Sequence, residues 1–258
     1  MFLTILHHPA PSIPTIRTLA TFNISANRLC APGTKALAEV LEGNQTITEL
    51  NISNNGMGWD DWYKEGSDMS GVQALANAIP TMGALVKFDI SSNELRAEGG
   101  KNLAGALKDN KIMKELNISN NDITRNSTSY IREDMPGVIA IGDAIPTMGE
   151  LVKFTISGER YYDNGIKDAP PVTIEASMIE ADFSGKYLGA LGAILIAAFL
   201  PMCKYVQEYI PLSDRPTPDI FSAIRAMTSL NVSNNNLTYY GKVMSGVEAL
   251  AAAIPECK

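Results

Sequence analysis

The sequence predicts an α/β solenoid, an arc with parallel strands on its concave side and helices on its convex side. Three observations support this prediction. The chain repeats itself at an offset of 66 residues, since residues 31–53 match 97–119 and residues 68–91 match 134–157. Short stretches share one apolar template, and apolar residues at helical spacing follow them. A long period of this kind indicates stacked units that each bury one face against a neighbour.

The template has apolar residues at positions one, four, six and eleven and an Asn at position nine. Successive side chains of a strand point to opposite faces, so positions four and six are expected inside and positions three, five and seven on the concave face. The fifth and sixth copies carry Glu159 and Lys186 in place of the Asn. The seven copies span 19–29, 47–57, 85–95, 113–123, 151–161, 178–188 and 227–237.

Each turn is expected to lead into a helix. After the third and fourth residue of such a segment an apolar residue recurs, as in Val72, Leu75, Ala76 and Ile79, which places these residues on one face of a helix. In the uncharged stretch 187–203, apolar residues lie at the same distances after the template as in the other repeat helices. It also falls short of the roughly 20 residues that a membrane span needs. We therefore expect a buried repeat helix there and no membrane span.

The recurring LxxLxLxxN pattern resembles the leucine-rich repeat family, and the resemblance covers essentially the whole chain. The 28-residue spacing with a helix in each unit is most similar to the ribonuclease-inhibitor class. The resemblance implies a single solenoid over 1–258 with about seven units that alternate between 28 and 38 residues, irregular at 158–226. The array starts near the end of one unit and stops before another strand, so we also expect the chain to be a fragment of a longer array.

The template asparagines are expected to satisfy backbone groups of the turn that follows each strand, since these groups would otherwise be buried without partners. Every unit needs the same bonds, which favours a structural role over a ligand-binding one. This structural ladder consists of Asn27, Asn55, Asn93, Asn121 and Asn235.

Charges alternate in sign at template position three. Glu49, Lys87, Glu115 and Lys153 occupy consecutive copies, and Glu180 follows in the sixth. Opposite charges on adjacent strands support one another. The row is interpreted as a self-neutralising ladder that keeps the concave face hydrated, with a charge-matched docking face as the alternative.

Insertions lengthen alternate units at the edge between strand and helix. They contain both tryptophans of the chain, and aromatic residues on loops of a rigid scaffold commonly bind partners. The alternative is that these aromatic residues only cover the edge of the solenoid. The candidate partner-binding residues of the insertions are Trp59, Asp60, Asp61, Trp62, Tyr63 and Tyr130.

Composition excludes several classes of function. The net charge is -7, which disfavours nucleic acid as a partner. The two histidines are adjacent near the N-terminus and the three cysteines are far apart, so no metal site, disulfide framework or catalytic triad is indicated. We expect no cofactor, no enzymatic activity and a cytoplasmic location, because no secretory signal is recognisable.

The leading hypothesis is therefore a non-enzymatic scaffold or recognition module that binds a protein partner. One alternative is a GTPase-activating module, which is implied by the similarity to the activator of Ran. Another is an extracellular recognition ectodomain. The full-length gene would distinguish them, since a signal peptide with a membrane span favours the ectodomain and a bare array favours the scaffold.

Overall fold

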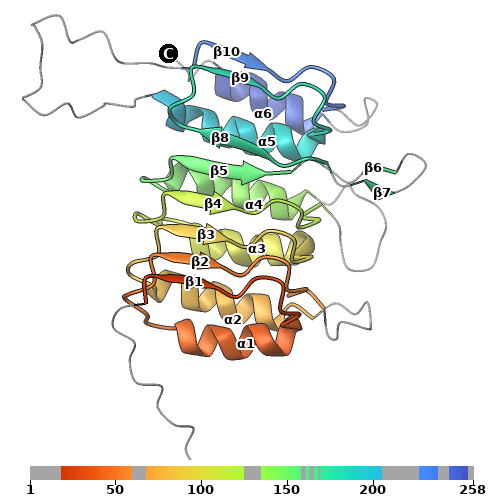
Figure 1. Cartoon of the computed structure of the whole chain (residues 1–258). Coiled ribbons are helices and arrows are strands. Elements are labelled where there is room, and N and C mark those ends of the chain that lie inside the picture. Colours follow the sequence, from red (N-terminus) through yellow and green to blue (C-terminus); the bar gives the residue numbers. More distant parts are fainter. Residues whose placement is uncertain are drawn as a thin grey trace, which may run out of the picture.

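The strands of the template lie side by side along one face of the molecule, with the helices behind them (Figure 1). The computed structural model describes residues 19–59, 68–124, 135–157, 161–162, 166–167, 169–204, 227–237 and 244–254. The α/β solenoid predicted from the sequence is confirmed, and a strand lies at each of the seven template copies. These strands are β1 (Thr21–Asn23), β2 (Glu49–Asn51), β3 (Lys87–Asp89), β4 (Glu115–Asn117), β5 (Lys153–Ile156), β9 (Glu180–Asp182) and β10 (Ser229–Asn231).

The first five strands are parallel and keep one register, so equivalent template positions lie opposite one another. Behind them lie the helices, and short 3-10 turns follow three of these. Strand residues at template positions four and six and one face of each helix form the core between the two layers. The helices are α1 (Cys30–Leu41), α2 (Ser70–Ala78), α3 (Arg96–Leu107), α4 (Pro136–Ala144), α5 (Gly189–Phe199) and α6 (Ser245–Ala253); the turns are η1 (Ile79–Thr81), η2 (Ile145–Thr147) and η3 (Leu200–Lys204).

The 66-residue period corresponds to a pair of closely packed helices. In α2, a Cβ on Gly71 would lie 2.5 Å from the Ala31 carbonyl oxygen of α1. In α4, a Cβ on Gly137 would likewise lie 2.6 Å from the Ala97 carbonyl oxygen of α3. Only glycine lets the backbones approach this closely, so α1 pairs with α2 and α3 with α4, and α5 with α6 likewise.

The region after β5 departs from the repeat. A short antiparallel pair, β6 (Tyr161–Tyr162) and β7 (Ile166–Lys167), follows β5, and β8 (Val172–Glu175) then returns antiparallel to it. The alternating residues of β8 place Val172 and Ile174 in the core opposite Ile156 and Phe154. The six-stranded sheet has the order β1-β2-β3-β4-β5-β8, and β9 and β10 form a separate parallel pair.

This arrangement corrects the expected neighbour of Lys153. The sequence placed Glu180 beside it on the next strand, whereas Glu175 of β8 lies opposite Lys153 and Glu180 lies opposite Ser229. The prediction was wrong because it assumed that every strand neighbour in the sheet comes from the next template copy. The charge alternation continues nonetheless, with a glutamate supplied by the inserted strand.

The uncharged stretch forms α5, which packs between α4 and α6. All of its residues except Ala198 are buried. Its Phe199 ring stacks on Phe154 of β5 with ring centroids 6.1 Å apart, which joins the irregular region to the first sheet. Across the residues that the structure describes, no helix has both the length and the apolar character for crossing a membrane.

Candidate functional site

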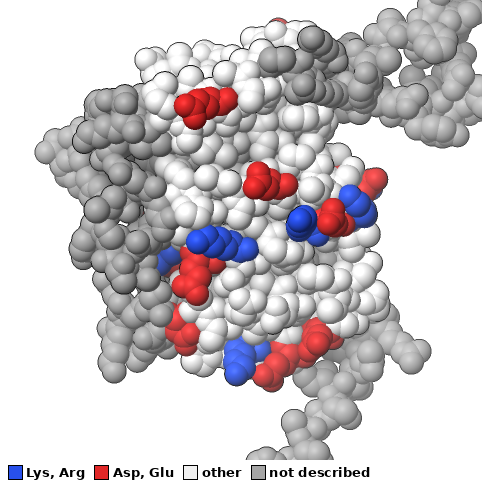
Figure 2. All heavy atoms as spheres, turned by 180° about the vertical axis from the view of Figure 1, so that it is seen from behind, with Lys and Arg blue, Asp and Glu red and all other residues white. Residues whose placement is uncertain are grey.

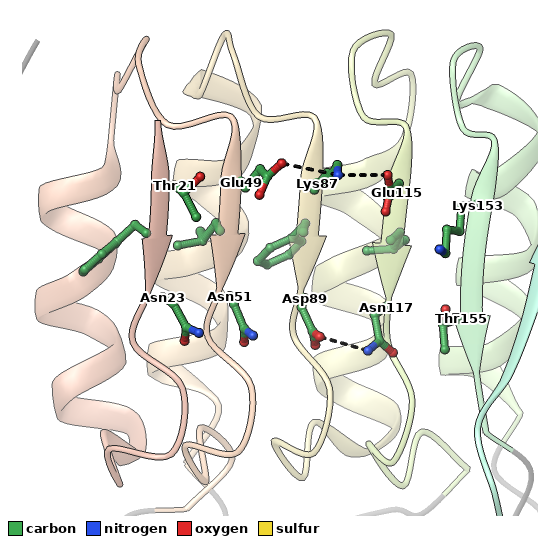
Figure 3. Close-up of a pocket in the computed structure, with 14 residues that line it drawn as sticks. Thr21, Asn23, Glu49, Asn51, Lys87, Asp89, Glu115, Asn117, Lys153 and Thr155 are labelled. Carbon is green, nitrogen blue, oxygen red and sulfur yellow. Dashed lines mark hydrogen bonds and ion pairs between the residues drawn. The ribbon is translucent and has the colours of Figure 1, made fainter. Parts of the chain in front are cut away.

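A groove of about 380 Å³ lies on the open face of the sheet, across strands β1 to β5 (Figure 3). Two rows of polar side chains line it, and both run across the strands. Template position three supplies a charged row, and position five supplies a second row of mainly amide side chains. The parallel register places equivalent positions about 4.8 Å apart on adjacent strands, so each row is nearly continuous.

In the charged row, Lys87 lies between two glutamates. Its Nζ is 3.3 Å from Glu49 Oε1 and 3.3 Å from Glu115 Oε1. Hydrogen bonds to Glu115 and then to Glu49 raise the pKa of the Lys87 amine above its usual value. The next lysine, Lys153, has its Nζ 3.4 Å from Glu175 Oε1. The structure thus brings the four charged residues singled out from the sequence into one row, with Glu175 added.

The second row consists of Asn23, Asn51, Asp89, Asn117 and Thr155 (Figure 3). In Asn51, Asp89 and Asn117, the Oδ1 atom accepts hydrogen bonds from the backbone N–H and the hydroxyl of the Ser two positions later. The Nδ2 of Asn117 also donates to Asp89 Oδ2 at 3.0 Å. These bonds fix the direction of each side chain, so the groove is preorganised.

Sequence analysis missed this row, although a signal for it was present. Every copy has a serine at template position seven, and Asn or Asp stands two residues before it in six of the seven copies. A residue of that kind forms a local turn with the serine. The amide nitrogens of Asn23 and Asn51 meet no hydrogen-bond acceptor among the described residues. They remain available as donors on the open face.

The concave face carries an excess of carboxylates. The strands of the six-stranded sheet place four acidic residues on this face but only two basic ones. The acidic residues are Glu49, Asp89, Glu115 and Glu175, and the basic residues are Lys87 and Lys153. Two more acids, Glu180 and Asp182, lie on β9. Hydrogen bonds from Ser184 lower the pKa of the Asp182 carboxyl, which keeps that group ionised.

The template asparagines lie away from the groove, at the turns that follow the strands. Asn55 and Asn93 are fully buried, and the Nδ2 of Asn55 donates to the Ile52 and Ile24 carbonyls of its own and the preceding unit. The backbone N–H of Asn55 donates to Asn93 Oδ1 at 2.8 Å. Comparable bonds involve the other members, Asn27, Asn121 and Asn235. The side chains of Asn55, Asn93, Asn121 and Asn235 therefore each tie two units together, whereas that of Asn27 bonds within its own unit.

Of the aromatic insertion, the structure describes Trp59. This residue is half-buried, and its carbonyl accepts the Ala31 N–H of α1 while its own N–H donates to Gly56. Its backbone therefore links one unit to the preceding helix. The remaining candidates of the insertions, Asp60, Asp61, Trp62, Tyr63 and Tyr130, lie outside the described residues.

Within the described part of the chain, no cluster of His, Cys, Asp or Glu side chains could hold a metal ion. Cys30 and Cys203 are buried and form no disulfide. The helix side of the molecule carries scattered charges of both signs (Figure 2). The groove is thus a polar, concave and preorganised surface.

The comparison with known protein families agrees with this architecture. The family described as "Leucine Rich repeat" matches residues 43–58 and 85–104. A solved structure described as "Leiomodin-1 Actin-Binding Site 2 (ABS2)" superposes with a TM-score of 0.44 and 16% sequence identity, covering 58% of this chain and 82% of that chain. The matched residues include strands β2 and β3 with the turns that follow them. The chain contains leucine-rich repeats.

Proposed function

We propose that this chain is a non-enzymatic interaction module whose groove binds an extended segment of a protein partner. The observation that carries the proposal is the pair of ordered polar rows on the concave face. Leucine-rich repeat domains are suited to protein binding, since a curved array presents a long continuous surface. The groove adds side chains that are held in place before any partner arrives.

The two rows can recognise different parts of one segment. The Nδ2 groups of Asn23 and Asn51 can donate to main-chain carbonyls of an extended peptide, because such a peptide exposes its backbone along its whole length. The carboxylates of Glu49, Asp89 and Glu115 can accept Lys or Arg side chains at its flanks. The excess of carboxylates favours a segment with net positive charge.

The first test locates the bound segment. A photo-cross-linking amino acid is placed at Asn51 in the groove or at Ile139, which is 46% exposed on α4 at the helix side. Partner proteins are expected to be captured at position 51 and not at position 139. Capture at position 139 alone would overturn the assignment of the groove.

The second test measures the contribution of charge. Asp89→Asn removes one negative charge, and the neighbouring strands already carry Asn at this position with the same bonds to serine. The variant is expected to keep its unfolding midpoint and to weaken binding of the cross-linked partner several-fold, with the larger loss at low salt. A matched control is Asp143→Asn on α4, which lies on the helix side and should leave binding unchanged. Equal binding by Asp89→Asn and wild type would exclude a positively charged segment.

A further inference from the structure

A break in the sheet leaves two strand edges open inside the described array. β8 pairs with β5 and β9 pairs with β10, but β8 and β9 do not pair with each other. Figure 1 shows these two strands set apart, whereas the other neighbouring strands lie side by side. Residues 169–204 are described without interruption, so the break is a feature of the fold within a continuous stretch of chain.

The edge that β9 leaves open is paired in the regular units. The N–H at template position three donates to a carbonyl just before the preceding strand in β2, β3, β4, β5 and β10, as from Lys87 to Thr48 at 2.9 Å. The carbonyl at position five of the same strands accepts from the preceding unit. The equivalent groups of β9 are the Glu180 N–H and the Asp182 carbonyl. Neither has a hydrogen-bond partner among the described residues.

The edge of β8 on the side away from β5 is open as well. Only every second residue of β8 directs its backbone groups toward β5, as the bond from the Ala176 N–H to the Val152 carbonyl at 2.8 Å indicates. The N–H groups of Thr173 and Glu175 therefore point away from β5, and they meet no acceptor in the part of the chain that the structure describes. An open strand edge is a template for a further strand.

Charge explains why β8 and β9 do not close into a hairpin. The residues 176–179 connect them, and a hairpin with this connection would place Glu175 opposite Glu180. Like charges directly opposite on paired strands are destabilising. Asp182 adds a further carboxylate, and hydrogen bonds from Ser184 lower its pKa and keep it ionised. Neither strand carries a basic residue of its own.

The size of the core side chain changes at the same place. Template position four points into the core and is Leu or Phe in six copies, whereas in β9 it is Ala181. Ala181 is 6% exposed, so it still faces the core. A strand placed between β8 and β9 would direct every second side chain to the core side of the sheet. Such a side chain would lie beside a methyl group instead of a bulky residue.

We propose that β8 and β9 bind an extended segment of a protein partner, which adds as a strand between them. The backbone of the segment pairs with the open groups of both strands. Its side chains alternate between Lys or Arg, which face the carboxylates of Glu175, Glu180 and Asp182, and apolar residues, which face the core. This surface is separate from the groove across β1 to β5 and acts independently of it.

Defined peptides and the 258-residue chain provide the test. The probe is a fluorescent peptide in which lysine and valine alternate, and its anisotropy measures binding. A peptide of the same composition with the lysines and valines in separate blocks is the control for charge alone, since its side chains cannot sort onto two faces. A third peptide keeps the alternating sequence but has N-methyl groups on alternate amides, which removes N–H donors. The alternating peptide is expected to bind several-fold more tightly than either control.

Hydrogen exchange locates the bound peptide. The amides of Thr173, Glu175 and Glu180 are expected to gain protection when the alternating peptide binds, because they become hydrogen-bonded. The amides of Ile174 and Ala181 already face β5 and β10, so their exchange should change little.

Substitutions separate this surface from the groove. Glu180 and Asp182 are exposed, and β10 carries Asn231 where β9 has Asp182. The double variant Glu180→Gln and Asp182→Asn should therefore keep its unfolding midpoint and bind the alternating peptide several-fold more weakly. Asp89→Asn is the matched control in the groove, and it should leave the protection of β8 and β9 unchanged.

Two results would overturn the proposal by placing the peptide or the partner elsewhere. Binding of the alternating peptide without protection of Thr173, Glu175 and Glu180 would exclude strand addition at these edges and leave the groove as the binding surface. Protection of the same amides that appears without peptide, as the protein concentration rises, would show that a second copy occupies the edges. Equal binding of the alternating and the block peptide would also overturn it, because charge alone would then account for the affinity.

Discussion

The array from β1 to β4 and the region from β5 to α5 are built from the same template but hold together differently. In the first region each strand pairs with the strand of the next copy, and buried asparagines bond from unit to unit. In the second, an antiparallel strand separates β5 from β9, and Lys186 takes the place of the asparagine. The break in the sheet thus coincides with the break in the asparagine ladder.

This difference shows which part of the repeat is essential. Apolar strand and helix positions are retained in both regions, and the core runs through both without interruption. The asparagine is replaced in the two copies on either side of β8, by Glu159 and Lys186, although β9 of the second copy still pairs in parallel with β10. Packing therefore maintains the solenoid where the asparagine is lost, and the asparagine adds hydrogen bonds between neighbouring units where it is present.

The largest expected effect comes from weakening the contact between β5 and α5, which links the six-stranded sheet to the units that follow it. Phe154 of β5 and Phe199 of α5 are both fully buried and stack on each other at this contact. Phe199→Ala should lower the free energy of unfolding by about 3 to 5 kcal/mol through the cavity it leaves. Because each unit of a solenoid contacts only its neighbours, β9 to α6 should then unfold before the first region.

Urea unfolding followed by hydrogen exchange of the two regions measures this separation. Phe22→Ala is the control, since Phe22 is only half-buried at the end of the array. A single cooperative unfolding transition in Phe199→Ala would show that the contact between β5 and α5 does not limit the coupling between the units on either side of it.

A smaller effect is expected at the helix pairs of the regular region. Gly71→Ala places a Cβ 2.5 Å from the Ala31 carbonyl oxygen and must push α2 away from α1. We expect a loss of about 2 to 3 kcal/mol, as is usual for overpacking. Gly105→Ala in α3 is the matched control, because its Cβ would meet nothing within 4 Å. Gly105→Ala should raise the free energy of unfolding by about 0.5 to 1 kcal/mol through helix propensity. Thermal unfolding of both variants measures the two effects.

Much of this architecture could be predicted from the sequence. The template located all seven strands, because apolar positions with a period of two leave little choice of register. The partner of Lys153 could not be predicted, since β8 lies between template copies and carries no template of its own. The second polar row of the groove was missed because Asn and Asp at position five also suit a solvated strand end.

The position of a template asparagine along the array should determine how much stability is lost when its side chain is removed. Asn93→Ala removes Nδ2 bonds to three carbonyls and leaves the buried Asn55 N–H without its acceptor. We expect a loss of about 2 kcal/mol. Asn27 is exposed at the end of the array, so Asn27→Ala should cost clearly less. Equal unfolding midpoints in urea for these two variants would show that the ladder does not link the units.

The smallest effect is expected in the charged row. Lys87→Met removes both ion pairs of the Lys87 amine. The amine and the two glutamates are exposed, so water solvates these charges well and the ion pairs contribute little to stability. The change in unfolding midpoint should be smaller than that of Asn27→Ala, and it should have a definite pH dependence. The pKa of Lys87 is raised in the folded chain, so its stabilising contribution is complete below the pKa of the unfolded chain and is lost as pH rises through the folded value. Thermal unfolding of both proteins from neutral to alkaline pH should therefore show the small difference shrinking. A difference that is large at neutral pH would mean that the row holds the sheet together, and the groove would then have fewer side chains free to change partners on binding.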